Sequence, residues 1–302
     1  MKKKTKWVLA LVWLSAIFAS MWIFGRYLAT DLELFQQVYL RIGLATLLAI
    51  LVFYRSINFS NYIKIPKKEL LLLFGRGSLN YLAVVVFTYA ILHTNLANVS
   101  FVVLFPTIAL FSIIFLWEKV NISKGIVLIL SMLWVLFIGK ESFSYSLWSW
   151  EIAAIICDVL FAIVYLSRGL HSKILSNKEI TVWMLFSGFI FTFVVSMLLW
   201  EQLSFWDNIL DKGLILMLFW SAIFNIINML LMNYGFAKVK WILADRILTL
   251  EVLFALLLWF IFYSERPSSV EIIWMLLIVG SVLYLQKVEY KEEKDKKVTK
   301  KI

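Results

Sequence analysis

Apolar runs of about membrane-spanning length follow one another along almost the whole chain of 302 residues. A helix that crosses a bilayer needs roughly 20 mostly apolar residues. With 63% hydrophobic residues, the chain has more apolar surface than a soluble core can bury. We therefore expect an all-α membrane protein with ten transmembrane helices, at residues 7–27, 35–54, 70–91, 97–117, 124–139, 149–167, 180–200, 214–236, 243–263 and 270–286.

The distribution of lysine and arginine predicts how these spans are oriented. Short loops rich in these residues stay in the cytoplasm. Most of the 29 lysines and arginines fall on the side of the predicted spans that also holds both termini. We expect a multi-pass protein of the plasma membrane, of the bacterial cytoplasmic-membrane type, with both ends cytoplasmic. The net charge of +10 then reflects membrane topology, and no nucleic-acid partner is expected.

The two halves of the chain resemble each other. Trp117-Glu118-Lys119 ends the fourth predicted span and Ser264-Glu265-Arg266 ends the ninth, while the third and eighth end in Tyr89-Ala90 and Tyr234-Gly235. Because five is an odd number of spans, a repeated five-helix unit inserts the second time in the opposite orientation. The predicted organisation is a cytoplasmic N-terminus at 1–6, a first repeat at 7–139, an external linker at 140–148, a second repeat at 149–286 and a lysine-rich cytoplasmic tail at 287–302. We expect this tail to be solvated, as a disordered end or a short extension of the last helix.

These features resemble the drug/metabolite transporter superfamily and, within it, the bacterial EamA-type ten-helix transporters. The resemblance implies two inverted five-helix repeats around a central cavity, lined chiefly by the first, third, fourth, sixth, eighth and ninth helices. It does not specify the substrate. The chain departs from the pattern in having Leu253 where the first half has Pro106. The other residues that carry the resemblance are Leu40-Arg41, Arg76-Gly77, Leu96-Ala97, Glu118, Glu265 and Pro267.

Asp158 is an ionisable residue near the middle of the sixth predicted span. Phe161 and Tyr165 follow it at i+3 and i+7, on the same helical face. Ionisable side chains are costly inside the hydrocarbon layer and are functional candidates. A carboxylate beside aromatic rings can bind an organic cation by charge and cation–π contact. The alternative, which stays open, is that Asp158 pairs with Arg41 or Arg76 to hold helices together.

The eighth predicted span carries a polar stripe through an apolar helix. Asn225, Asn228 and Met232 recur on one of its faces and can line a cavity, although hydrogen bonding between helices is the alternative. In the third span Asn80 shares a face with Arg76, which we expect to extend its charge to the membrane surface. Other candidate substrate-binding residues are Trp22, Ser15 and Ser100, with Trp13 as a further candidate for the cavity.

Two residues are candidates for coupling and gating. Glu251 lies deep in the ninth predicted span, where a carboxylate can take up a proton, although a structural hydrogen bond to a neighbouring helix is the alternative. Pro106 removes a backbone hydrogen bond within the fourth span and permits a bend. Asp245 and Arg246 begin the ninth span, and we expect them near the membrane surface without needing to pair with each other.

Together these patterns predict a secondary-active transporter that moves a small organic metabolite by alternating access. The expected substrate is an amino acid or a related cationic or heteroaromatic compound, with protons or a counter-solute as the driving partner. A lipid-carrier flippase of the same fold is the alternative, and an intramembrane aspartyl protease using Asp158 and Asp245 is less favoured. We expect no enzymatic activity, cofactor or metal site, and no oligomer is implied, since the two histidines are isolated and the chain has no Walker loop.

Overall fold

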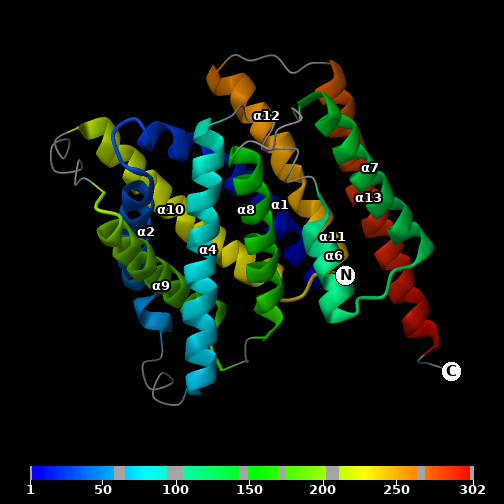
Figure 1. The fold of residues 1–302 in the computed structure, drawn as a ribbon. Coiled ribbons are helices and arrows are strands. Elements are labelled where there is room, and N and C mark those ends of the chain that lie inside the picture. The colour runs from blue at the N-terminus through cyan, green and yellow to red at the C-terminus, as the bar shows by residue number, and fades with distance from the viewer. Residues whose placement is uncertain are drawn as a thin grey trace.

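The computed structural model describes residues 2–57, 65–93, 105–142, 149–170, 174–201, 211–263 and 269–299. Regular structure within these residues is helical (Figure 1). The helices are α1 (Lys2–Leu28), α2 (Leu34–Phe53), η1 (Tyr54–Ser56), α4 (Lys67–His93), α6 (Thr107–Leu116), α7 (Ile122–Ser142), α8 (Ser149–Leu166), η2 (Ser167–Leu170), α9 (Asn177–Leu198), α10 (Lys212–Gly235), α11 (Trp241–Leu248), α12 (Leu250–Tyr263) and α13 (Ser269–Thr299).

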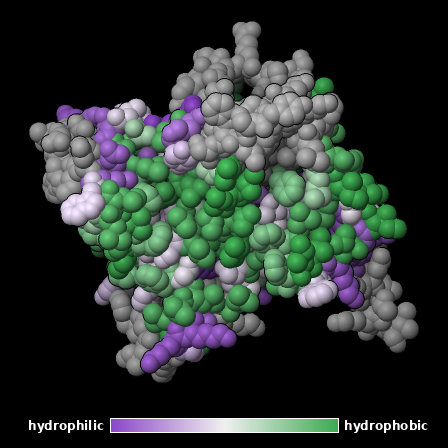
Figure 2. All heavy atoms as spheres, viewed as in Figure 1, coloured by the Kyte–Doolittle hydropathy of each residue, from purple (hydrophilic) through white to green (hydrophobic). Residues whose placement is uncertain are grey.

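An apolar band crosses the visible face of the bundle (Figure 2). Figure 2 shows apolar side chains across the middle of the visible face, with polar residues toward its upper and lower edges. Six stretches of the described residues are long and apolar enough to cross a membrane, and they correspond to α1, α2, α4, α8, α9 and α10. Apolar helices that face lipid satisfy their backbone hydrogen bonds internally, so this arrangement suits a bilayer. The chain is therefore a helical membrane protein, as its composition predicts.

Polar side chains at helix ends fix where α2 and α9 begin. Ser176 and Glu179 form a capping box at the start of α9, in which each side chain accepts a hydrogen bond from the other residue's backbone N–H. Glu201, just after α9, caps α2 from a different part of the chain. Its carboxylate accepts from the backbone N–H groups of Phe35 and Gln36, each at 2.9 Å. A negative charge at a helix N-terminus is favourable, so Glu201 ties these two helices together at one end.

Close helix contacts in the bundle occur at glycines. α4 packs along α8 and α9, α1 along α10 and α12, and α2 along α9 and α10. Gly77 of α4 lies against Met184 and Ser187 of α9, and Gly188 of α9 lies against the ring of Tyr81. Small residues allow the backbones of membrane helices to approach closely, so these seams depend on the missing side chains.

The ninth predicted span is two helices instead of one. α11 ends at Leu248 and α12 begins at Leu250, with Thr249 between them. A helix end leaves backbone carbonyl groups without partners in the helix. Thr249 Oγ1 donates to the carbonyl of Arg246 at 2.7 Å, and Ser15 Oγ of α1 lies 3.0 Å from the carbonyl of Ile247. These two hydroxyl groups stabilise the break.

Pro106 stands at the start of a helix. Phe105 and Pro106 are not helical, and α6 begins at Thr107. A proline before the first turn removes no hydrogen bond from the helix, so it is tolerated there. The structure therefore differs from the expected bend in mid-helix, while residues 97–104 of this predicted span lie outside the described residues.

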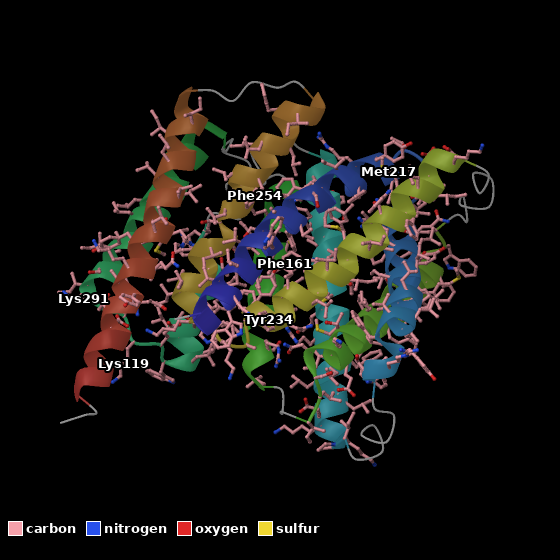
Figure 3. The ribbon with its side chains drawn as sticks, turned by 180° about the vertical axis from the view of Figure 1, so that it is seen from behind. Lys119, Phe161, Met217, Tyr234, Phe254 and Lys291 are labelled. Atoms are coloured by element: carbon pink, nitrogen blue, oxygen red, sulfur yellow. The ribbon has the colours of Figure 1, made fainter. Side chains whose placement is uncertain are left out.

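The last helix continues past the predicted end of its span and ends at Thr299. Its extension is held by Glu292, which forms ion pairs with Lys124 of α7 at 3.2 Å and with Lys240, just before α11, at 2.9 Å. Asn121 Nδ2 also donates to Glu292 at 2.7 Å. The labels of the neighbouring residues Lys119 and Lys291 mark this end of the bundle in Figure 3. Glu292 thus joins three separate segments of the chain.

This cluster predicts a stability that depends on pH. Partial burial acts to raise the pKa of Glu292, but the hydrogen bonds and charges of Lys240 and Lys124 outweigh it, so the pKa is lowered. A carboxyl group with a lowered pKa contributes stability that is present above its unfolded pKa and is lost as the pH falls through its folded pKa. Glu292→Gln should therefore lower the unfolding free energy by about 1 kcal/mol at neutral pH. The difference from the native protein should disappear as the pH falls below about 4.

Thermal unfolding in detergent across this pH range measures the effect. Lys291→Gln is the matched control, because it removes an exposed charge from the adjacent position and should give no such pH-dependent difference. A Glu292→Gln difference that stays constant into the acid range would show that the ionisation of Glu292 does not stabilise the fold.

Candidate functional site

A pocket lies between α1, α4, α8 and the broken helix α11–α12, beside the start of α6. Figure 3 places Phe161, one of its lining residues, near the middle of the bundle. The lining includes three carboxylates and several aromatic rings. The carboxylates belong to Asp158, Asp245 and Glu251, and the rings to Phe18, Phe87, Phe105, Phe161 and Tyr165.

The predicted face of α8 borders this pocket. Asp158, Phe161 and Tyr165 all line it, and the rings of Phe161 and Tyr165 stack with centroids 5.7 Å apart. The carboxylate of Asp158 accepts a hydrogen bond from Thr107 Oγ1, in the first turn of α6. The structure thus brings these three residues together around one space, with the carboxylate tied to α6.

The alternative partners of Asp158 are engaged elsewhere. Arg76 is only 2% exposed, so its expected position at the membrane surface is wrong. It donates to the carbonyl of Val164 at 2.9 Å and to Asn233 Oδ1 at 2.8 Å. Arg41 donates to the carbonyl of Gln37 in its own helix at 3.2 Å. Among the described residues Asp158 therefore forms no ion pair.

Asp245 and Arg246 form a buried ion pair, which corrects the expectation that they lie near the surface. Asp245 Oδ2 accepts from Arg246 Nη2 at 2.6 Å and from its Nε at 2.9 Å, although the residues are adjacent in sequence. Asp245 Oδ1 accepts from the backbone N–H of Ala109 at 3.3 Å, and Arg246 Nη1 donates to Ser131 Oγ at 2.6 Å. A charge-assisted bond with two contacts is strong, and it neutralises one of the three pocket carboxylates.

Glu251 reaches the pocket from the second residue of α12. Its Oε1 accepts a hydrogen bond from Trp22 Nε1 of α1 at 2.8 Å. The Trp22 ring meets Phe87 edge to face, with centroids 4.8 Å apart. Glu251 therefore both lines the pocket and bonds to a neighbouring helix. Trp13, the other tryptophan suggested for the cavity, is 63% exposed, so that suggestion is wrong.

An aromatic stack leads away from the pocket. Tyr165 stacks on Phe236 at 4.6 Å, and Phe236 on Trp241 at 5.7 Å, which continues the Phe161–Tyr165 pair to the start of α11. Sequence patterns did not single out Phe236 or Trp241. Phe236 caps the end of α10 and Trp241 begins α11, so no helical spacing relates them to Tyr165 in α8.

The remaining candidates lie outside the lining of this pocket. Asn225 donates to the carbonyl of Ser221 in its own helix at 2.8 Å. Ser100 lies outside the described residues. Contact of the other candidate residues with a solute stays a prediction. The candidates that the pocket lining does not include are Ser15, Trp22, Asn80, Asn225, Asn228 and Met232.

The carboxyl groups and rings of the pocket are chemically suited to an organic cation. In the described part of the chain Asp158 and Glu251 form no ion pair, whereas Asp245 is held by Arg246. No cluster of three or more His, Cys, Asp or Glu residues there has the arrangement of a metal site. Two carboxylates beside stacked rings provide the charge and the π-faces that bind an organic ammonium group.

No protein-family model matches this chain, and no curated protein matches its sequence. Among solved structures, one described only as "Crystal structure of protein" is similar over 93% of this chain and 96% of its own, with a TM-score of 0.70 and 15% sequence identity. At such low identity the similarity shows the fold alone. The fold thus occurs in a protein of known structure, whose description assigns no substrate or activity.

Proposed function

We propose that this protein is a secondary-active transporter that carries a small organic cation, or an amino acid or heteroaromatic compound with a positively charged group, across the plasma membrane. The observation that carries this proposal is the central pocket. It combines two carboxylates that lack a cation partner in the described residues with the rings of Phe18, Phe87, Phe161 and Tyr165. A charged group within the hydrocarbon layer is costly unless it serves a polar or charged ligand.

The helix contacts support an inverted five-plus-five repeat and the drug/metabolite transporter fold. In the proposed repeat each helix of the first half has a counterpart in the second half. The counterparts are α1 and α8, α2 and α9, α4 and α10, and α6 and α11–α12. Under an exchange of these counterparts the α4–α8 contact corresponds to α10–α1, and the α4–α9 contact corresponds to α10–α2. The α6–α8 contact corresponds to α11–α1 or α12–α1. The structure contains each of these contacts. The α2–α9 contact maps onto itself, as a contact across a two-fold axis must.

A helix start and a helix break beside the pocket support alternating access. α6 begins at Thr107, whose hydroxyl bonds Asp158, and the α11–α12 break lies between Asp245 and Glu251. Transporters commonly bind their substrate where discontinuous helices meet, because helix ends present free backbone groups there. Small rotations of α6, α11 and α12 can expose the site to one side of the membrane and then to the other.

The hydrogen-bond partners of Asp158 and Asp245 disfavour the alternative of an aspartyl protease. An aspartyl dyad requires two carboxylates that share a proton. Asp245 instead accepts two hydrogen bonds from Arg246, and Asp158 accepts one from Thr107. The lipid flippase remains an alternative that the same assay can address.

Reconstitution into liposomes tests the proposal. A panel of radiolabelled amines, basic amino acids and neutral or acidic amino acids should show uptake of cationic members and none of the acidic ones. Solute uptake without cleavage of an added membrane peptide is the expected result. Lipid scrambling or peptide cleavage without solute uptake would overturn it.

A further inference from the structure

Two hydrogen bonds fasten one face of α1 to the broken helix. Trp22 Nε1 donates to Glu251 of α12 at 2.8 Å, and Ser15 Oγ lies 3.0 Å from the carbonyl of Ile247 in α11. Ser15 and Trp22 are seven residues apart and therefore share a helical face. Their partners lie on either side of the break at Thr249. We call this pair of contacts the α1 clasp.

The two contacts of the clasp respond differently to a proton. Ser15 meets a backbone carbonyl and shares its hydroxyl with Leu11, so this contact has no titratable group. Trp22 meets a carboxylate. A hydrogen bond to an ionised carboxylate is roughly twice as strong as one between neutral groups. Proton uptake by Glu251 therefore weakens one end of the clasp and leaves the other unchanged.

Of the two rings on this face of α1, Phe18 lines the pocket and Trp22 lies outside its lining. Phe18 lies between the two contacts and meets Phe161 and Phe87 edge to face, at 5.2 and 6.0 Å. Trp22 also packs on Phe87. A movement of the Trp22 end of α1 away from α12 would carry both rings away from the pocket.

We propose that Trp22 is a positioning residue for Glu251, and that the clasp couples protonation of Glu251 to movement of α1. While Glu251 is ionised, Trp22 holds α1 against α12 and the pocket is covered. When Glu251 takes up a proton, the Trp22 end releases, the Ser15 contact acts as the pivot, and the pocket opens. This inference rests on the proposed transport function and names the group and the helix through which a proton acts.

Several titratable or charged groups share the surroundings of Glu251. Cys157, Asp158 and Tyr165 of α8 interact with it electrostatically. On α11 Asp245 also lines the pocket and is paired with Arg246, and α1 carries Arg26 one turn beyond Trp22. α13 packs on α12, and its described tyrosines, Tyr284 and Tyr290, are exposed. Because Asp158 and Glu251 interact, a cation at Asp158 and a proton on Glu251 influence each other.

The distance between α1 and α12, measured without substrate, tests the clasp. Spin labels are placed at Tyr27 and Leu257, which are exposed on α1 and α12, after Cys157→Ala removes the native thiol. Pulsed electron paramagnetic resonance then gives the distance distribution in mildly alkaline and mildly acidic buffer. Acidification should shift the native protein toward a longer distance.

Two substitutions should mimic the acidic state in alkaline buffer. Glu251→Gln retains an oxygen acceptor without the charge, and Trp22→Phe retains the ring against Phe87 without the donor. Each should raise the ratio of long to short distances about tenfold in alkaline buffer, because a hydrogen bond to a charged group is lost or weakened. Trp13→Phe, on the exposed face of the same helix, should behave as the native protein.

The inference is overturned if acidification leaves the native distances unchanged, or if either variant keeps the native alkaline distribution while its thermal unfolding shows a folded protein. The transport assay is read separately. A pH-dependent distance change without uptake of any solute would refute the proposed function and leave the clasp standing. Uptake together with distances that do not change with pH would refute the clasp and leave the proposed function standing.

Discussion

Asp158→Asn should abolish uptake of the cationic substrate in proteoliposomes. Asparagine has nearly the same shape, and its amide oxygen can still accept the hydrogen bond of Thr107, so the helices should stay in place. The substitution removes the negative charge that faces the pocket without an ion-pair partner in the described residues. A charge-assisted contact contributes about 3 kcal/mol, which corresponds to roughly 100-fold weaker binding.

Uptake and ligand-induced thermal stabilisation should be measured on the same preparations. Asp211→Asn is the matched control, since it makes the same change at the exposed cap of α10, outside the pocket, and it should retain uptake. If Asp158→Asn transports at the native rate, the carboxylate is not the binding group. If the variant fails to fold, the result supports a role of Asp158 in holding the helices together over a role in substrate binding.

Gly77→Ala should strongly destabilise the bundle, whereas Gly75→Ala should not. A Cβ at Gly77 would lie 1.9 Å from Ser187 Oγ and 2.7 Å from the backbone carbonyl oxygen of Met184. The backbone of α9 cannot move aside as a side chain does, so α4 and α9 must separate. Overpacking of this kind costs about 1–3 kcal/mol, and contact with backbone places the effect at or above the upper end.

Gly75, two residues away on α4, provides the matched control. A Cβ there meets nothing within 4 Å, and alanine favours a helix over glycine by about 1 kcal/mol. Detergent-solubilised Gly77→Ala should unfold several degrees below the native protein, and Gly75→Ala at or slightly above it. Equal melting temperatures for the two variants would show that the close packing of α4 on α9 does not depend on Gly77.

Part of the candidate site could be predicted from local spacing. Asp158, Phe161 and Tyr165 border one pocket because helical geometry alone puts i, i+3 and i+7 on one face. The depth of Glu251 also follows from its place in an apolar run. The stripe of Asn225, Asn228 and Met232 shows the limit of this reasoning, since spacing identifies a shared face but not the helix or space opposite it. Here Asn225 bonds within its own helix.

Contacts between distant segments were beyond such reasoning. The buried Arg76 donates to the carbonyl of Val164 in α8 and to Asn233 in α10. No pattern along the chain encodes these pairings, because each depends on which helices meet. The partner of Trp22, Glu251, lies 229 positions further along the chain.

Apolar length and composition by themselves determined that this chain forms a helical membrane protein, because the hydrocarbon layer requires long apolar helices whatever their neighbours are. They also determined which face of α8 carries its charge. Only the tertiary structure decided where a helix breaks and which pocket carboxylate forms an ion pair with Arg246. The hydroxyl groups of Ser15 and Thr249 support the break at α11–α12, and Arg246 forms an ion pair with Asp245, while Asp158 accepts a hydrogen bond from Thr107. Such choices depend on the packing of helices remote in sequence, where a buried polar group takes whichever partner the fold brings within hydrogen-bond reach.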